Sequence, residues 1–515
     1  MLFFGYFGKT VEFRAYSFKN ISLLLDGWVD KSDEQIVELY LKKGSEFIDE
    51  LRGEFRLCLV DNKTILLATD HLATKQIYYI DSGDFFAFSS NISKLKPYLK
   101  TLELNNDALL SYLSFLTPTP PHTFYKHIKK LPPASLLTYN KQGVSVSRYF
   151  NILDIKTTIC SEDEALQKLE KVLCEAIELR KTPKSISLLS GGIDSATINY
   201  FLKPTTAYTI QNSETPLAIK SAEFLGLELK VLDIKDMFDE VDELFDEPLN
   251  DPAALPLFHM LKQVKSDGYT RVFSGEGSDE LFLGYRQYRE FLELKELKNL
   301  KQKGYLSSFF HSHFSMSKEW ERHKRAFDGS LIFRGIGENF TDLQKNHLLK
   351  QNIKDNQALS YINHLRDMFV GSKDESFWYS FLDLEQLPAK TKLDTISQKL
   401  NLEITTPFLD KEVIKTTFSL TPSIRLGERK RVLKNTMKPY LSHEILSRRK
   451  KGFSSRFYEY LLEDDRVENI IKTNKRAGLF KEKELKNFIE DGKKGLYKNH
   501  LWSLYMLSIW LDKNF

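Results

Sequence analysis

Two short glycine-rich tracts, each placed directly after an apolar run, constrain this chain more than any other feature. The first, Ser-Gly-Gly-Ile-Asp-Ser at 190–195, follows an apolar run at 185–189 and precedes a helical pattern at 194–202. At such a strand–turn–helix corner, glycines let backbone N–H groups approach a phosphate, and the helix N-terminus adds favourable partial charge. No Gly-Lys-Ser/Thr follows, which excludes a Walker loop and leaves an ordinary structural turn as the alternative. The tract predicts a nucleotide phosphate site formed by Ser190, Gly191, Gly192, Asp194 and Ser195.

A second tract gathers carboxylates after another apolar run. Residues 272–285 read Val-Phe-Ser-Gly-Glu-Gly-Ser-Asp-Glu-Leu-Phe-Leu-Gly-Tyr, with apolar residues on both sides of the acidic turn. Glu276, Asp279 and Glu280 repel one another unless a cation or ligand lies near. In an open α/β sheet, both tracts lie at the carboxyl ends of parallel strands, where ligands bind. The second tract therefore adds to the predicted nucleotide and metal site the residues Ser274, Gly275 and Asp279.

The two tracts together carry a resemblance. Ser-Gly-Gly-x-Asp-Ser resembles the pyrophosphate loop of ATP pyrophosphatases, which split ATP into AMP and PPi. With Ser-Gly-Glu-Gly-Ser-Asp-Glu, the chain is similar to the synthetase domain of the asparagine synthetase family. The resemblance implies ATP and Mg²⁺ as cofactors, with the metal ion held by Asp194 and Asp279. It also implies an adenine contact at Ile210, in a strand expected at 206–210.

The same resemblance implies roles for three further residues. Glu276 stands where amide-forming members carry a Glu that helps to deprotonate incoming ammonia, whereas β-lactam-forming members carry Tyr. Lys450, within Arg-Arg-Lys-Lys-Gly-Phe at 448–453, matches the lysine that stabilises negative charge on the adenylate and the tetrahedral intermediate. Lys430 matches a basic position near the phosphates. An ion pair with a nearby Lys or Arg is the alternative interpretation of Glu276.

One departure from the family concerns the second substrate. Lys-Leu-Asp at 392–394, followed by Glu403 and by Pro-Phe-Leu-Asp at 407–410, matches the family's Lys-x-Asp…Glu-x-Arg-x-Pro-Phe-Leu-Asp. Thr405 stands where Arg is usual, and the Asp-Arg-x-Ser-Met run after the first aspartate is absent. We therefore expect the second-substrate geometry to differ from the family's usual one.

The chain changes character along its length. Residues 1–107 contain short apolar runs separated by polar turns, which predict an antiparallel sheet with strands at 57–60, 64–68, 76–80 and 85–88, and helices at 35–44 and 107–115. A helical period at 161–180 is followed by alternating strands and helices, which predict a parallel sheet. Tyr and Phe between 286 and 378 are expected to pack between long helices. We place a domain boundary near residue 150.

The first 150 residues resemble the glutamine-hydrolysing half of the same family. The resemblance rests on Leu-Arg-Gly-Glu-Phe at 51–55, Thr-Asp-His-Leu at 69–72 and Ile-Lys-Lys-Leu-Pro-Pro at 128–133. It implies an α/β fold: an Ntn-hydrolase-like αββα sandwich in residues 1–150, and a PP-loop ATP pyrophosphatase domain, built as a parallel sheet with added helices, in residues 151–515.

Several residues in this part of the chain differ from those that are usual in the family's glutamine-hydrolysing half. The family's glutaminase uses an N-terminal cysteine whose α-amine serves as base, whereas Leu2 and Phe3 occupy that place here. Asp-Gly-Trp at 26–28 replaces the Asn-Gly-Glu signature of the glutamine pocket, and Asn91 stands where an acidic residue is usual. Cys58 lies inside an apolar strand pattern and is expected to pack rather than react. We predict a class II glutamine amidotransferase-like domain that has lost glutamine hydrolysis and serves as a scaffold or lid.

Composition narrows the class of protein. With 74 basic and 70 acidic residues and a net charge of +4, the chain has no strong field that favours nucleic acid or a membrane. The basic segment at 425–456 lacks the regular interleaving of aromatic residues that single-strand binding requires. Three widely spaced cysteines argue against structural zinc and a disulfide framework. No signal peptide or transmembrane run is recognised, so the cytoplasm is the expected compartment.

These inferences predict an ATP-dependent amide ligase. A substrate carboxylate attacks the α-phosphorus to form an acyl-adenylate and PPi, and an amine then displaces AMP, with the protein supplying position and charge. The acceptor is a small-molecule or peptide carboxylate. The nitrogen comes from free ammonia, from an amine on the substrate or from a separate glutaminase. The sequence leaves open whether two copies of the chain form a homodimer.

Other functions stay open. Lasso-type macrolactam cyclases and sugar uronamide-forming amidotransferases also resemble the family, and motifs do not separate them from asparagine synthesis. A non-catalytic nucleotide-binding subunit is a contrasting hypothesis, opposed by the joint presence of Asp194, Asp279, Glu276 and Lys450. A tRNA-modifying PP-loop enzyme is disfavoured because a catalytic cysteine pair and a basic surface are missing.

Overall fold

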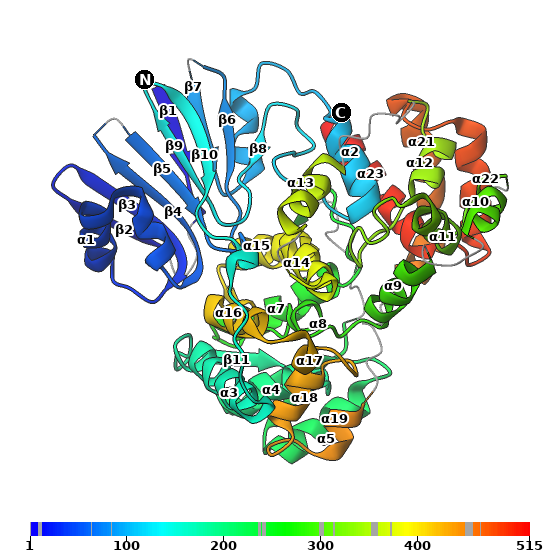
Figure 1. Cartoon of the computed structure of the whole chain (residues 1–515). Helices are drawn as coiled ribbons and strands as arrows, with labels where there is room; N and C mark the ends of the chain where they lie inside the picture. Colours follow the sequence, from blue (N-terminus) through cyan, green and yellow to red (C-terminus); the bar gives the residue numbers. More distant parts are fainter. Residues whose placement is uncertain are drawn as a thin grey trace.

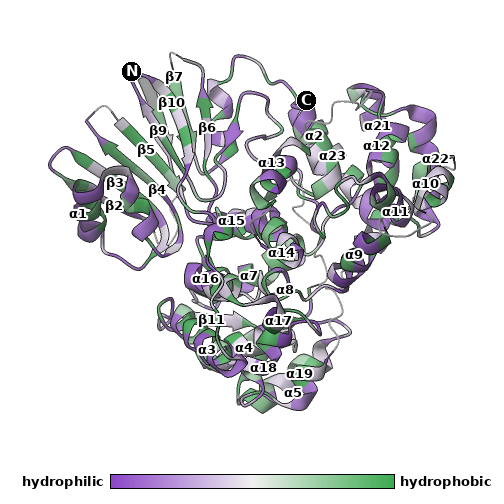
Figure 2. Cartoon of the chain, viewed as in Figure 1, coloured by the Kyte–Doolittle hydropathy of each residue, from purple (hydrophilic) through white to green (hydrophobic). Residues whose placement is uncertain are grey.

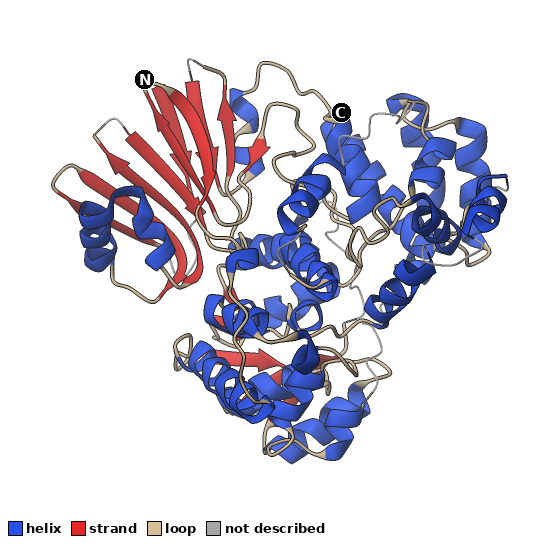
Figure 3. Cartoon of the chain, viewed as in Figure 1, coloured by secondary structure: helices blue, strands red, loops and turns tan. Residues whose placement is uncertain are grey.

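The structure, a computed structural model, describes residues 2–8, 13–62, 64–83, 85–234, 238, 244–297, 303–312, 315–351, 359–370, 373–448, 457–463 and 465–515. The fold is mixed α/β, and the described residues form three sheets and a helical C-terminal part (Figures 1 and 3). Within these ranges, no helix combines the length and apolar character that crossing a membrane requires.

Two sheets form the N-terminal part. Their strands are β1 Leu2–Tyr6, β2 Arg14–Phe18, β3 Ile21–Val29, β4 Gly53–Asp61, β5 Thr64–Thr69, β6 Tyr78–Asp81, β7 Phe85–Ser89, β8 Lys129–Lys130, β9 Ser135–Asn140 and β10 Gly143–Arg148. One sheet has the order β1-β7-β6-β8, and the other has the order β10-β9-β5-β4-β3-β2. The predicted antiparallel pairing is confirmed for the runs at 57–60 and 64–68. The pair β1 and β7 is parallel instead.

The two sheets pack face to face, with helices on their outer faces. Between them, the rings of Phe86 and Tyr139 stack with centroids 4.3 Å apart, within a buried cluster drawn from both sheets. On the outer face of the six-stranded sheet lies α1 (Asp33–Lys43), which a capping box at Ser32 begins. On the outer face of the four-stranded sheet lies α2 (Asn106–Phe115). The order of layers is therefore helix, sheet, sheet, helix, and we call this part the sandwich.

The third sheet is entirely parallel. Its strands are β11 Ser185–Leu188, β12 Thr206–Ile210, β13 Glu228–Leu232, β14 Arg271–Phe273 and β15 Glu403–Thr405, in the order β13-β12-β11-β14-β15. All four neighbouring pairs run in the same direction, which confirms the predicted parallel sheet. β12 and β14 are buried along their whole length because helices cover both faces of the sheet.

Helices from distant parts of the sequence cover that sheet. One face is packed by α3 (Glu162–Glu178), α4 (Ile193–Leu202) and α5 (Thr215–Leu225). The other face is packed by α7 (Ala254–Ser266) and α15 (Pro388–Leu400). The remaining α-helices are α8 Ser278–Leu281, α9 Arg286–Glu296, α10 Lys303–Ser312, α11 Lys318–Asp328, α12 Asp342–Leu348, α13 Ser360–Phe369, α14 Glu375–Gln386, α16 Lys411–Ser419, α17 Pro422–Arg425, α18 Arg431–Met437, α19 His443–Ser447, α20 Phe457–Leu462, α21 Arg466–Ala477, α22 Glu482–Lys493 and α23 Lys498–Asn514.

The expectation of long helices between 286 and 378 is wrong. The described helices of this region are short, and the last, α14, has 12 residues. Local signals interrupt them: Ser317 caps the start of α11, and Gly329 ends it in the left-handed region. The aromatic residues do pack, as expected, and the ring of Tyr288 stacks on that of Tyr379. Figure 2 shows the polar outer helices α9 and α11 in purple and the largely apolar strands of the sandwich in green.

Buried ion pairs join the sandwich to the parallel-sheet part. Arg56 in β4 donates to Asp26 of the sandwich at 2.7 Å and to Asp394 of α15 at 2.8 Å. Arg180, just after α3, donates to Glu54 of β4 at 3.0 Å. Removing one partner of a buried pair typically costs about 3–5 kcal/mol, because the other charge is left without compensation. These pairs therefore fix the sandwich against the edge of the parallel sheet.

Candidate active site

The two glycine-rich loops leave neighbouring strands at one edge of the parallel sheet. Ser187 of β11 lies opposite Phe273 of β14, so the loops that follow start side by side. α4 begins within the first tract, at Ile193, and no side chain caps its N-terminus at Gly192. A cavity of about 310 Å³, which we call the loop cavity, is lined by both loops, by β12 and by the start of α18. Uncapped N–H groups of a helix facing such a space favour an anion.

The first loop requires glycine at one position. Gly191 has φ of +74°. A Cβ there would lie 2.7 Å from the carbonyl carbon of Leu217 and 2.8 Å from the nitrogen of Ala218, both backbone atoms of α5. The loop is also held internally, because Ser195 Oγ accepts from the N–H of Ser190 at 3.1 Å. The result is a tight, fixed turn at the cavity wall.

Lys430 lies between the carboxylates of the two loops. Its Nζ is 2.6 Å from both carboxylate oxygens of Asp194 and 2.7 Å from Oδ1 of Asp279. Ser278 Oγ also donates to Asp194 at 2.6 Å. A Cβ at Gly284 would lie 2.5 Å from Cε of Lys430 and would overlap the Asp279 carboxylate, so the glycine makes this close approach possible. One cation thus holds both loops together.

The arrangement fits Mg²⁺. Asp194 and Asp279 converge on one cation, the ammonium group of Lys430, and carboxylate oxygens are the protein ligands that Mg²⁺ prefers. Among the described residues, no group of three or more His, Cys, Asp or Glu side chains could hold a metal ion. Two carboxylates leave positions for phosphate oxygens and water, which is typical of Mg²⁺ bound with a nucleotide.

Glu276 and its neighbours form the opposite wall of the loop cavity. Lys392 Nζ lies 3.0 Å from Glu276 Oε1 and 2.8 Å from Asp251 Oδ2. The Lys392 side chain is 5% exposed and that of Glu276 is 33% exposed, and both residues line the cavity, so the carboxylate is the more accessible of the two groups. The ion pair considered as the alternative interpretation of Glu276 is present. It orients the carboxylate and does not remove it from the cavity.

A second carboxyl group beside the loops is held differently. Glu280 accepts from the hydroxyl of Tyr285 at 2.7 Å. Burial, together with the charge of Asp279, raises the pKa of Glu280 to about 8. Its backbone carbonyl accepts from Ser380 of α14, which fixes α8 against that helix.

A second cavity adjoins the first. This distal chamber has a volume of about 370 Å³ and shares with the loop cavity four lining residues: Glu276, Glu280, Tyr285 and Lys392. Its far end is formed by the start of α11, the segment 334–339 and the end of α14. A ligand in the distal chamber can therefore contact residues that also line the loop cavity.

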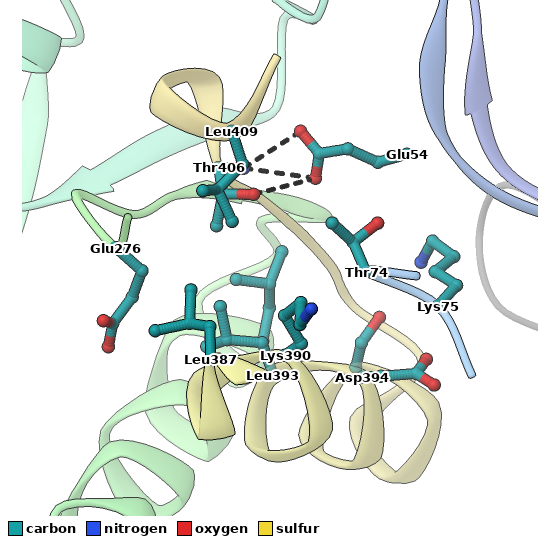
Figure 4. Close-up of a pocket in the computed structure, with 12 residues that line it drawn as sticks. Glu54, Thr74, Lys75, Glu276, Leu387, Lys390, Leu393, Asp394, Thr406 and Leu409 are labelled. Atoms are coloured by element: carbon teal, nitrogen blue, oxygen red, sulfur yellow. Dashed lines mark hydrogen bonds between the residues drawn. The ribbon is translucent and has the colours of Figure 1, made fainter. Parts of the chain in front are cut away.

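A small cavity separates Glu276 from the sandwich (Figure 4). Its volume is about 20 Å³, room for one water-sized molecule. Figure 4 shows Glu276 on one side and Glu54 on another, with dashed hydrogen bonds from Thr406 to the Glu54 carboxylate. Thr405, which stands where the family carries Arg, also donates to Glu54, at 2.9 Å. Thr405 therefore takes part in the contact between β15 and the sandwich.

The structure brings most of the sequence-predicted site residues into one place. The loop cavity is lined by Ser190, Gly192, Asp194, Ser195, Ile210, Ser274, Gly275, Glu276, Asp279 and Lys430. Gly191 lies in the same loop, between two of these residues, without lining the cavity. Lys450 lies outside the described residues.

Arg448, Lys392 and Tyr285 are among the residues that line the loop cavity without having been predicted as site residues. Arg448 donates to the carbonyl of Ser190 at 3.1 Å and to Glu214 at 2.6 Å. Lys392 and Tyr285 form the wall shared with the distal chamber. Arg448 and Lys392 begin the sequence matches at 448–453 and 392–394, and Tyr285 ends the second tract. The sequence therefore marked the positions of these residues but did not predict their contacts.

The residues that depart from the glutaminase pattern have structural partners. Cys58 is fully buried between the two sheets, and burial raises the pKa of its thiol far above the ordinary value, which disfavours the reactive thiolate. Asp26 pairs with Arg56 at 2.5 Å. Asn91 accepts from the N–H of Ser93 at 2.9 Å and caps a short helical turn.

The fold and the site together define an α/β protein whose parallel sheet ends in two glycine loops bridged by a cation. Residues 168–512 match the asparagine synthase family, and residues 16–150 match the glutamine amidotransferase domain. The chain belongs to the asparagine synthase family.

Relatives among characterised proteins agree with this assignment. Glutamine-hydrolyzing asparagine synthetase 1 of Bacillus subtilis (strain 168) is 27% identical over 98% of this chain and 83% of its own length. Asparagine synthetase 3 of the same organism is 27% identical over 54% of this chain and 49% of its own length. Asparagine synthetase B of Escherichia coli (strain K12) is 26% identical over 49% of this chain and 47% of its own length.

Proposed function

We propose that this protein is an ATP-dependent amide ligase that forms AMP and PPi. It adenylates a substrate carboxylate and transfers ammonia or an amine to the acyl group. The observation that carries the proposal is the position of Lys430 between Asp194 and Asp279, which joins two glycine loops around one cation site. A site that only needed structural stability has no use for two carboxylates, that of Asp279 buried and that of Asp194 partly exposed, at the wall of a 310 Å³ cavity.

The residues take distinct roles in this proposal. The first loop and the N-terminus of α4 bind the phosphates, Ile210 contacts the adenine, and Asp194 and Asp279 hold Mg²⁺. Mg²⁺ supplies charge neutralisation on the phosphates. Lys430, and Lys450 by its family position, stabilise negative charge that develops on the α-phosphate. Glu276, oriented by Lys392, accepts a proton from the attacking amine.

We further propose that residues 1–150 form an Ntn-like, class II glutamine amidotransferase-like domain without glutaminase activity, and that residues 151–515 form a PP-loop synthetase domain. The layer order of the sandwich and the burial of Cys58 support this. Nitrogen then comes from free ammonia, from an amine on the substrate or from a separate glutaminase. Glutamine is expected to yield no glutamate with the purified chain, while ammonium salts support turnover. Release of glutamate would contradict the proposal.

Carboxylate-dependent ATP–PPi exchange tests the ligase function directly. The full-length protein is incubated with ATP, Mg²⁺, labelled PPi and a panel of carboxylic acids. At least one class of acid is expected to support exchange. Asp194→Asn is expected to reduce that exchange about a hundredfold or more, whereas Asp163→Asn, an exposed change in the first turn of α3, leaves it unchanged. ATP binding without exchange for any acid would favour a non-catalytic nucleotide-binding subunit.

A further inference from the structure

The segment 405–410, which we call the strip, lies between the second glycine loop and the sandwich. Its sequence matches the family's Pro-Phe-Leu-Asp and departs from the family at Thr405, and the proposed function gives it no role. All six of its residues are buried. Figure 4 shows Leu409 of the strip between Glu276 of the loop and Glu54 of the sandwich. The strip therefore has two sides, and each side has its own contacts.

One side of the strip holds the second glycine loop. The N–H of Ser274 donates to the carbonyl of Thr405 at 2.9 Å. Leu409 packs directly on Gly277, where an added Cβ would lie 2.1 Å from Cδ2 of the leucine. Glu276 lies between these two contacts, so the strip fixes the loop on both sides of that carboxylate.

The other side of the strip is held by three residues of the sandwich. Glu54 accepts hydrogen bonds from the start of the strip. His71 Nε2 donates to the carbonyl of Leu409 at 2.7 Å. Arg52 donates to both carboxylate oxygens of Asp410, from Nε at 3.0 Å and from the NH2 group at 2.9 Å. Such paired bonds fix orientation as well as distance, because the guanidinium group and the carboxylate are both planar.

The second glycine loop needs support from outside itself. Gly275 and Gly277 flank Glu276, and Gly277 has φ of +88°. Without side chains at these two positions, the backbone is free to adopt other conformations and cannot hold itself by local packing. A displacement of about 1 Å at a reacting group can lower a rate about a hundredfold. The contacts of the strip therefore bear on the positions of Glu276 and Asp279.

We propose that Arg52, Glu54 and His71 are positioning residues for the ligase reaction. Through the strip, they hold the second glycine loop so that Glu276 and Asp279 stay at working distance from the first loop. This inference rests on the proposed ligase function. It gives the sandwich a part in that function which requires no glutamine.

The first test is metal-dependent ATP binding, which does not depend on catalysis. Arg52→Met keeps the bulk of the side chain and removes its bonds to Asp410. Calorimetric titration of the full-length protein with ATP is expected to show binding about fivefold weaker or more in Mg²⁺, because Asp279 is displaced. In EDTA, where the first loop binds the phosphates, the affinity is expected to stay within about twofold. Unchanged binding in both buffers, or an equal loss in both, would overturn the proposal.

Two further variants control for a general loosening of the sandwich. Asp49→Asn breaks another ion pair between the sandwich and the parallel-sheet part, with Lys411 at 2.8 Å, one position beyond the strip. This variant is expected to bind ATP as the wild type does, and a loss like that of Arg52→Met would contradict the role of the strip. Arg52→Lys keeps the charge without the planar fork and is expected to fall between Arg52→Met and the wild type.

The second test is a double-mutant cycle in ATP–PPi exchange. Arg52→Met and Leu409→Ala are each expected to lower kcat about fivefold or more, with KM for the acid within about twofold. Both changes cut the same connection, so the double variant is expected to lose no more than the worse single variant. Losses that multiply would overturn the proposal. Thermal melts check folding, and Leu409→Val replaces Leu409→Ala if that variant is unfolded at the assay temperature.

The two tests separate the two proposals. A wild-type protein that supports no exchange with any acid contradicts the ligase function, while the Mg²⁺-dependent binding of ATP still decides the role of the strip. Exchange that Arg52→Met and Leu409→Ala leave unchanged keeps the ligase function and overturns the positioning role.

Discussion

Lys392 and Glu276 form an ion pair, with Nζ 3.0 Å from Oε1, at the wall between the loop cavity and the distal chamber. Asp251 lies on the other side of the same ammonium group, at 2.8 Å. The pair holds the Glu276 carboxylate at the loop cavity, where an adenylated acid and an attacking amine would meet in the proposed function. A carboxylate so placed is suited to accept a proton after adenylation is complete.

Replacing Glu276 by Gln is expected to separate the two half-reactions. The amide keeps the size of the side chain and removes its basicity, so amide formation falls by about 10²–10⁴-fold. Adenylation needs no base, so acid-dependent ATP–PPi exchange stays within about threefold. Product analysis by mass spectrometry and labelled PPi exchange measure the two steps, with the exposed change Glu38→Gln as control. Equal losses in both steps would assign Glu276 a role in binding or folding instead.

Lys430 and a metal ion are expected to compete for one position. Lys430→Met leaves Asp194 and Asp279 facing each other without a cation, which costs roughly 3–5 kcal/mol in metal-free buffer. Mg²⁺ then restores stability by occupying the same space. Thermal unfolding with Mg²⁺ or with EDTA measures this, and Mg²⁺ should raise the Tm of the variant more than that of the wild type. The same shift in both proteins would contradict a shared position. Lys415→Met, a partly exposed change, is the control.

The two glycines of the first loop are expected to respond differently to alanine. Gly191→Ala places a Cβ in the left-handed region and against the backbone of Leu217 and Ala218, so we expect the loop to shift and ATP affinity to fall at least tenfold. Gly192 has φ of −87°, and the atom nearest to its added Cβ is Ser190 Oγ at 3.5 Å. Gly192→Ala is therefore expected to keep the native Tm within a few degrees. Calorimetric titration with ATP and thermal melts check both variants, and an unchanged ATP affinity in Gly191→Ala would refute the steric argument.

Asp383 is expected to make stability depend on pH. Burial raises the pKa of its carboxyl to about 7. The unfolded chain ionises from its ordinary value near 4 upward, so the group's contribution is fully present below pH 4 and is lost as pH rises towards about 7, by at most about 4 kcal/mol. Asp383→Asn removes this loss. Urea unfolding at pH 5 and pH 8 should show a smaller difference between the two pH values for the variant, and Asp163→Asn should behave as the wild type does. Parallel pH profiles would contradict the assignment.

Local patterns predicted the parallel sheet and its loops because each rests on interactions between near neighbours. The strand expected at 206–210 is β12, with the same bounds, and the helical period at 161–180 is α3. Apolar periodicity and a capping box at Ser161 are local signals that act before tertiary contacts form. The long helices expected between 286 and 378 failed because caps at Ser317 and Gly329 outweighed the overall helical tendency.

Pairings across the chain had no such signal. Glu276 and Lys392 are separated by 116 positions, and Glu54 and Arg180 by 126. Each of these residues is an ordinary charged side chain when considered with its sequence neighbours. The partner of each residue is known only once the chain has folded. For this reason the sequence matched Lys392 to a motif but did not predict its ion pair with Glu276. Lys318, Arg334 and Gln386, which line the distal chamber, likewise come from different elements.

The sequence by itself determined where strands turn into helices and which turns contain glycine, because backbone geometry and apolar period are properties of a few consecutive residues. It also determined membership of the asparagine synthase family. Only the tertiary structure decided which carboxylate faces which ammonium group and where donors remain for a ligand. Electrostatic and hydrogen-bonding partners depend on distance in space, and folding alone sets that distance.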